Sequence, residues 1–150
     1  MNQYNDNGKK HGLWEIQHPN GQLHYRITYK DGKKHGLFES YFDNGQLIYR
    51  GKYINDEQHG FCKKYWDNGN LLSKGEFLNG KRHGFFEYYY DNGKLDAKGP
   101  YLNCKKHGFF KQYWSNGQIR YEGAYINGKE IGLWQVYLKT GELQSIEFYI

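Results

Sequence analysis

Residues 61–84 read FCKKYWDNGNLLSKGEFLNGKRHG, and this 24-residue unit decides the fold because it recurs along the chain. Two series of six glycines each repeat with a period of 24 residues, and no insertion interrupts them. They are Gly12, Gly36, Gly60, Gly84, Gly108 and Gly132, and Gly21, Gly45, Gly69, Gly93, Gly117 and Gly141. A fixed period of this kind indicates a repeat architecture, in which units bury a core only by stacking on their neighbours.

Each unit predicts two short strands and two turns. In the quoted unit, Phe61–Trp66 and Leu71–Leu78 have strand composition. Asp67-Asn68-Gly69 between them predicts a type I′ hairpin turn, which needs positive φ at both central residues and therefore favours Asn-Gly. Residues 79–84 predict a second, longer turn that leads into the next unit. Turn signals recur about every 10–12 residues, which leaves no room for a helix.

Alternation along the second strand marks a buried face. Leu47, Tyr49, Gly51 and Tyr53 occupy every other position, which is the period of a half-buried strand. The recurring glycine either makes room for a neighbouring aromatic ring or marks a β-bulge. The first strand does not alternate cleanly, and Leu37 and Phe38 predict apolar side chains on both of its faces.

These patterns predict an all-β protein, an elongated single antiparallel β-meander of about six 24-residue hairpin repeats, twisted and curled. About twelve strands at ~4.8 Å spacing give a ribbon roughly 55 Å long. We expect one repeat domain over 1–150, with units at 5–28, 29–52, 53–76, 77–100, 101–124 and 125–150.

Composition narrows the class of protein. Aromatic residues make up 19% of the chain, so they must supply most of the buried area. The N-terminal residues lack the basic and apolar regions of a signal peptide, and no run of about 20 apolar residues is present. We therefore expect a cytoplasmic protein without membrane-spanning segments. The formal charge of +5 weakly favours an acidic partner.

Residues 121–129, YEGAYINGK, resemble the MORN repeat pattern, as do residues 49–53, YRGKY. The complete unit, Asn-Gly-Lys-x-His-Gly-x-Phe-x-x-Tyr-x-x-Asn-Gly-x-Leu, is similar to the bacterial variant found in YwqK-type antitoxins. The resemblance extends from Asn5 to Ile150. It implies a hairpin ribbon without catalysis, with antitoxin or immunity roles in bacteria and lipid or protein scaffolding roles in eukaryotic relatives.

A column of histidines raises the question of a metal site. Equivalent positions in successive units lie two strands apart, roughly 10 Å, whereas zinc needs its ligand nitrogens at about 2.0–2.1 Å. We therefore expect no metal and no cofactor, and predict that each histidine packs on an aromatic ring and hydrogen-bonds the turn backbone. The column is His11, His35, His59, His83 and His107.

Nucleophilic catalysis finds no support in the repeat. The serines fall in four different columns, and none lies in a nucleophile-elbow motif. Cys62 stands where other units place an aromatic residue, so we predict a small core side chain. Cys104 replaces a turn glycine and is predicted to be exposed, too far from Cys62 for a disulfide. No catalytic residue is predicted.

The second turns carry basic residues that form a candidate basic edge. This edge could meet acidic phospholipid or an acidic protein, with nucleic acid the least favoured partner, or it could serve solubility alone. Asp56-Glu57-Gln58 interrupts it in the third unit. Its residues are Lys33, Lys34, Lys81, Arg82, Lys105 and Lys106.

A column of varying bulky residues before the Asn-Gly turns is the candidate partner-binding surface. It follows a nearly constant tyrosine column, and if those tyrosines pack in the core, the varying column faces outward. Alternatively, curling of the sheet buries the varying column too. The candidates are Phe42, Trp66, Tyr90 and Trp114, with their cross-strand neighbours Ile48, Leu72 and Arg120.

The sequence thus predicts a non-catalytic protein-binding repeat module, of the antitoxin or immunity type, that neutralises a partner protein such as a toxin or effector. The alternative is a peripheral scaffold that binds phospholipid or nucleic acid through the basic edge. The apolar last strand, around Ile146–Ile150, also predicts a possible homodimer through an exposed sheet edge.

Overall fold

A computed structural model describes residues 2–150 as one antiparallel sheet of 14 strands without a helix in that range. Neighbouring strands pair in chain order, except that β10 adds only to β9. The predicted all-β meander is therefore confirmed. The strands are β1 (Gln3–Tyr4), β2 (Lys10–Gln17), β3 (Leu23–Lys30), β4 (Lys33–Tyr41), β5 (Leu47–Ile54), β6 (Glu57–Tyr65), β7 (Leu71–Leu78), β8 (Lys81–Tyr89), β9 (Leu95–Leu102), β10 (Lys105–Lys106), β11 (Gly108–Tyr113), β12 (Ile119–Ile126), β13 (Lys129–Tyr137) and β14 (Leu143–Tyr149).

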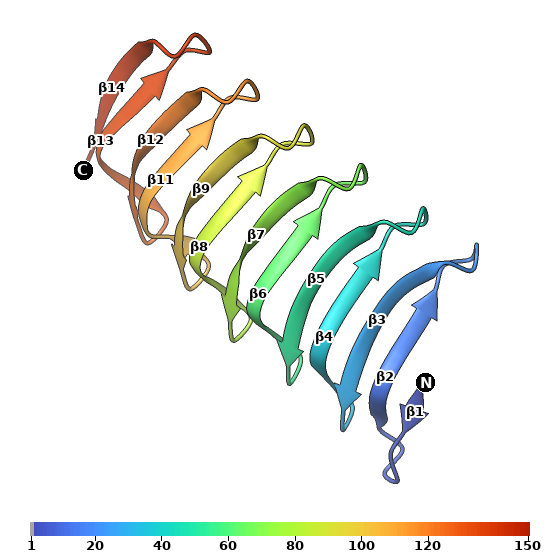
Figure 1. The fold of residues 1–150 in the computed structure, drawn as a ribbon. Coiled ribbons are helices and arrows are strands. Elements are labelled where there is room, and N and C mark those ends of the chain that lie inside the picture. The colour runs from blue at the N-terminus through green and yellow to red at the C-terminus, as the bar shows by residue number, and fades with distance from the viewer. Residues whose placement is uncertain (1) are drawn as a thin grey trace.

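The hairpins lie side by side along a twisted, elongated ribbon, with the N- and C-terminal strands at opposite ends (Figure 1). Two short strands raise the count above the expected twelve. One is β1, which pairs with the start of β2. The other is β10, which is separated from β11 at His107, where the backbone N–H donates to the Pro100 carbonyl at 3.0 Å.

From β3 onward, the two kinds of turn have the reverse of the predicted geometry. Asn79 and Gly80 have φ of 49° and 75°, so the two-residue type I′ turn lies between β7 and β8. At the other turn only Gly69 has positive φ, and its N–H donates to the Trp66 carbonyl at 3.0 Å. This is a type I turn followed by a left-handed residue, so the type I′ prediction for Asn68-Gly69 was wrong.

Local hydrogen bonds explain this difference. The Asn68 side chain accepts from the Asn70 N–H at 2.9 Å, which holds Asn68 outside the left-handed region. A register shift between Lys64 and Tyr65 absorbs the additional turn residue. The first strands consequently begin directly after the two-residue turns, earlier than predicted.

The core is a row of aromatic rings on one face of the sheet. Phe86, Phe110 and Trp134 from first strands alternate with Tyr101 and Tyr125 from second strands. Successive rings meet edge to face, with centroid separations of 4.9 to 5.4 Å. Such pairs contribute about 0.5–1.5 kcal/mol each beyond area burial. Because a flat single sheet cannot cover its own side chains, this burial requires the hairpins to bow toward the aromatic face.

Both readings of the recurring glycine are correct. A Cβ at Gly99 would lie 2.4 Å from the Phe110 ring, and one at Gly123 would lie 2.3 Å from the Trp134 ring. The ladder is also irregular at this column, because the register shifts at Gly123. The bulge lets the aromatic side chain of the following strand lie directly over the glycine backbone.

Candidate binding surfaces

The face opposite the aromatic core carries a ladder of charged side chains. Glu39 is buried between Arg26 and Arg50, and its Oε1 lies 3.2 Å from the Arg50 Nε. The Tyr41 hydroxyl also donates to Glu39, at 3.0 Å. Burial raises the pKa of the Glu39 carboxyl, but the hydrogen bonds from Arg26 and Tyr41 outweigh burial and hold it below its ordinary value.

The same motif recurs in later units. Lys74 lies 2.6 Å from Glu87, which also accepts a hydrogen bond from Tyr89. Tyr137 donates to Glu122, which pairs with Lys111. The nearly constant tyrosines thus belong to the charged face and not to the aromatic core. The condition under which the varying column was expected to face outward is therefore not met.

A row of exposed apolar side chains follows the charged face along the ribbon. Exposure of these side chains ranges from 40% at Leu37 to 66% at Leu133. The failure of the first strands to alternate was the sequence signal for this row, since it placed apolar residues on both faces. We call it the apolar row: Leu13, Leu37, Phe61, Phe85, Phe109 and Leu133.

The varying column is half-buried and joins neighbouring units. The Trp66 indole N–H donates to the Tyr89 carbonyl at 3.0 Å, and Trp114 donates to the Tyr137 carbonyl at 3.1 Å. The Tyr90 hydroxyl makes the equivalent bond to the Tyr113 carbonyl at 2.6 Å. These side chains therefore hold successive hairpins together, and only their remaining surface is free for a partner.

Their cross-strand neighbours complete this end of the sheet. Phe42, Trp66 and Leu72 line one open hollow. The guanidinium of Arg120 lies 4.5 Å from the centre of the Trp114 ring. Ile48 is half-buried in β5. The structure thus brings most of the predicted partner-binding residues together in pairs, unit by unit.

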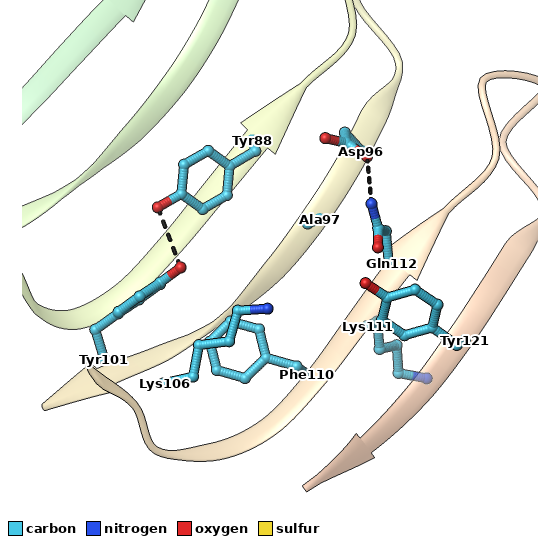
Figure 2. A pocket seen from close by; sticks show the side chains of 9 residues that line it. All are labelled: Tyr88, Asp96, Ala97, Tyr101, Lys106, Phe110, Lys111, Gln112 and Tyr121. Carbon is cyan, nitrogen blue, oxygen red and sulfur yellow. Dashed lines mark hydrogen bonds between the residues drawn. The ribbon is translucent and has the colours of Figure 1, made fainter. Parts of the chain in front are cut away.

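Some side chains of the candidate basic edge lie over aromatic rings, and others are exposed to solvent. Lys106 lies over the rings of Phe110 and Tyr125, with its Nζ 5.1 and 4.6 Å from their centres (Figure 2 shows it beside Phe110). Burial lowers the pKa of the Lys106 ammonium. Lys34 lies over the rings of Phe38 and Tyr53 in the same way, and Arg82 lies over those of Phe86 and Tyr101. The exposed basic residues of this edge are therefore Lys33, Lys81 and Lys105, together with part of Arg82.

A cavity on the aromatic face is lined by residues of the strands from β8 to β12 (Figure 2). The hydroxyls of Tyr88 and Tyr101 lie 3.4 Å apart, and Gln112 donates to Asp96 at 3.2 Å. Burial raises the pKa of the Tyr88 hydroxyl, so it stays protonated. The polar groups of this lining mostly bond one another, which leaves few to recognise a ligand.

The histidines and cysteines take mainly structural positions. His107 Nδ1 accepts from the Asn127 N–H at 3.4 Å, as predicted for the turn backbone, whereas Nδ1 of His35 and of His83 is buried without a hydrogen-bond partner. No group of three or more possible metal ligands occurs within residues 2–150. Cys62 is buried and Cys104 exposed, and both are free thiols, as predicted.

The repeated hairpin, the stacked aromatic core and the charged face define a repeat-based binding module. Four segments match the MORN repeat variant, at residues 10–31, 34–55, 82–103 and 106–127, and residues 49–71 match the MORN repeat. These matches cover more than half of the chain, so it belongs to the MORN repeat proteins. No curated protein matches the sequence.

Solved structures add little to this assignment. The chain overlaps a crystal structure of TarM at 16% identity and a TM-score of 0.40, over 80% of this chain and 21% of that one. A mutant of S. aureus TarM in complex with Fondaparinux, alpha-GlcNAc-glycerol and UDP gives 14% identity, the same TM-score and the same coverage. The chain spans about a fifth of the length of these proteins. Within residues 2–150, no helix has the length and apolar character needed to cross a membrane.

Proposed function

We propose that this chain is a non-catalytic module that binds a partner protein, and that it acts in the cytoplasm as an antitoxin or immunity protein. The observation that carries the proposal is the apolar row on the charged face. Phe61, Phe85 and Phe109 are each more than half exposed, although the chain has an aromatic core available on its other face. Exposed aromatic side chains repeated along one face of a sheet are typical of protein–protein interfaces.

The rest of that face suits the same role. The ion pairs around Glu39, Glu87 and Glu122 fix the positions of the charges that flank the apolar row. Charged groups around an apolar centre give an interface its specificity. The free surface of the varying column, at Phe42, Trp66, Tyr90 and Trp114, is a second contact region at the turn end of the same sheet.

Co-expression with the product of a neighbouring toxin gene tests the proposal. We expect the two proteins to co-purify and the toxin to lose its activity. Replacing Phe61, Phe85 and Phe109 together by serine should abolish both effects while circular dichroism stays that of a β-sheet. Lys129→Ser, a change at the exposed first residue of β13, serves as the control. If the triple variant still binds and neutralises, the apolar row is not the interface.

A second candidate function is binding to acidic phospholipid through the turns. Lys33, Lys81 and Lys105 are exposed at equivalent positions and support this alternative. Binding to phosphatidylserine vesicles should then fall steeply between low and moderate salt, and Lys→Glu changes at these three positions should remove it. Binding that is insensitive to salt would exclude this function.

Homodimerisation is a further proposal for the C-terminal edge. Ile146 and Phe148 of β14 are more than half exposed, and β14 pairs only with β13. Light scattering on a chain that ends before Ser145 should show a monomer if β14 carries the contact, in contrast to a dimer for the full chain.

A further inference from the structure

The third unit departs from the charge pattern of its two neighbouring units at one position, and Lys111, which stands there in the fifth unit, is paired with Glu122. In the second and fourth units the central residue of the first strand is Glu39 or Glu87, each bonded to a tyrosine hydroxyl two residues later. In the third unit this position is Lys63, and the tyrosine is Tyr65. The tyrosine hydroxyl that donates to a carboxylate in the neighbouring units thus has no carboxylate two residues before it in the third unit.

Lys63 also stands directly between two other basic residues. It is paired across the sheet with Arg50 on β5 and with Lys74 on β7. Like charges at directly opposed positions destabilise a sheet. Arg50 and Lys74 are relieved by Glu39 and Glu87, on the sides away from Lys63. Within residues 2–150, no carboxylate lies within ion-pair distance of Lys63.

A hollow of about 320 Å³ opens at this place on the charged face. Its floor is formed by the strand backbone at Gly51 and Cys62, since the Cys62 side chain points to the aromatic face. Its walls combine cationic, hydroxyl and apolar side chains from three strands. These are Leu37, Arg50, Lys52, Phe61, Lys63 and Tyr65.

We propose that this hollow binds a carboxylate side chain of the partner protein, together with an apolar side chain next to it. The proposal rests on the proposed function and assigns the chemistry of its recognition site. The carboxylate takes the place that Glu39 and Glu87 fill in the adjacent units. It accepts a hydrogen bond from Tyr65 and lies among Lys63, Arg50 and Lys52, while the apolar neighbour packs on Phe61 and Leu37.

The surroundings favour a protein over other anionic partners. Phe61 is 57% exposed and Leu37 is 40% exposed, so the site offers apolar contact directly beside its positive charge. A free phosphate has no group to use that contact. The hollow lies in the middle strands of the face and not at the turns, where a membrane surface would first meet the exposed lysines.

A peptide titration tests the site without a known partner. The probe is a short capped peptide with one glutamate between two leucines, and the matched probe carries glutamine in place of glutamate. We expect the first peptide to shift the backbone amide signals of β5 and β6 in NMR spectra. The glutamine peptide should bind roughly tenfold more weakly or worse, since a hydrogen bond to a charged group is lost.

Lys63→Glu is the decisive variant because it restores the residue found in the neighbouring units. It should fold at least as stably as the natural chain, since the new carboxylate meets Tyr65, Arg50 and Lys74. It should lose peptide binding by about tenfold or more. Lys105→Glu makes the same charge change at an exposed turn and should bind as the natural chain does. Equal binding by the Lys63→Glu variant, or equal loss in both variants, would overturn the site.

Two further arms separate the alternatives. If inorganic phosphate or phosphatidylserine vesicles shift the β5 and β6 signals and the peptide does not, the occupant is not a protein carboxylate. A co-purifying protein partner that binds the Lys63→Glu variant unchanged refutes the hollow but leaves the proposed function standing. Failure to find any protein partner refutes the proposed function. The peptide titration still tests whether the hollow binds a carboxylate, because it needs no partner.

Discussion

Gly99→Ala tests whether aromatic stacking over glycine holds the repeats together. The new Cβ would lie 2.4, 2.5 and 2.6 Å from three atoms of the Phe110 ring. Ordinary carbon contacts are about 3.5–4.0 Å, so the ring must move by about 1 Å. Phe110 is almost fully buried between Tyr101 and Tyr125, at centroid separations of 5.4 and 5.3 Å, so this movement disturbs both contacts.

Overpacking of this kind costs about 1–3 kcal/mol. For a chain of this size each kcal/mol lowers the melting temperature by about 2–4 °C, so we expect a drop of roughly 2–12 °C. The φ angle of Gly99 is not in the left-handed region, so alanine adds no backbone strain there. The loss therefore reports the steric contact, reduced by the smaller conformational entropy of the unfolded alanine variant. Thermal and urea unfolding, followed by circular dichroism, measure it.

The double variant Gly99→Ala with Phe110→Leu supplies the control. The smaller leucine leaves room for the new methyl group, so the double variant should lose less stability than the sum of the two single variants, by about 1 kcal/mol. If Gly99→Ala unfolds at the temperature of the natural chain, or if the two changes simply add, the ring does not require a glycine beneath it.

Three further changes probe single contacts. Cys62→Phe should destabilise the chain by about 1–3 kcal/mol in urea unfolding, because the Tyr49 ring already occupies the space over Gly51. Asn68→Ala should lower the melting temperature, since the side chain bonds both the Asn70 N–H and the Asp91 carbonyl and each bond contributes about 1 kcal/mol. The pKa of Glu39 is lowered in the folded chain, so its stabilising effect is present above the unfolded pKa and is lost as pH falls through the folded pKa. Glu39→Gln should therefore flatten the fall in melting temperature between about pH 5 and pH 3, relative to the natural chain.

The period of the sequence predicted most of the architecture. Glycine spacing and strand alternation indicated a meander of hairpins, and the aromatic content indicated what would fill its core. The same pattern led to the wrong position for the type I′ turn. Each pair of residues 68–69 and 79–80 is Asn-Gly, and the dipeptide alone does not show which of the two forms that turn. What distinguishes them is the hydrogen bond from the Asn70 N–H to the Asn68 side chain and the register shift at Tyr65.

The candidate sites were harder to predict because they depend on which residues meet across strands. The basic edge looked continuous in sequence, yet Lys34 and Lys106 turn over aromatic rings whereas Lys33 and Lys105 stay exposed. Adjacent strand residues point to opposite faces, so two neighbouring lysines cannot serve one surface. The sequence singled out the varying column as a candidate partner-binding surface. Its hydrogen bonds to the next unit form only because the hairpins stack side by side.

By itself, the sequence determined the repeat, the strand-forming segments and the residues that must be small. These properties are local, since they depend on the side chains of one unit and on a period of 24 residues. Only the tertiary structure decided that Lys63 stands between Arg50 and Lys74, and that Leu37 and Phe61 share a face with them. That placement depends on register, and the bulges shift register by one residue, which moves every following side chain to the other face.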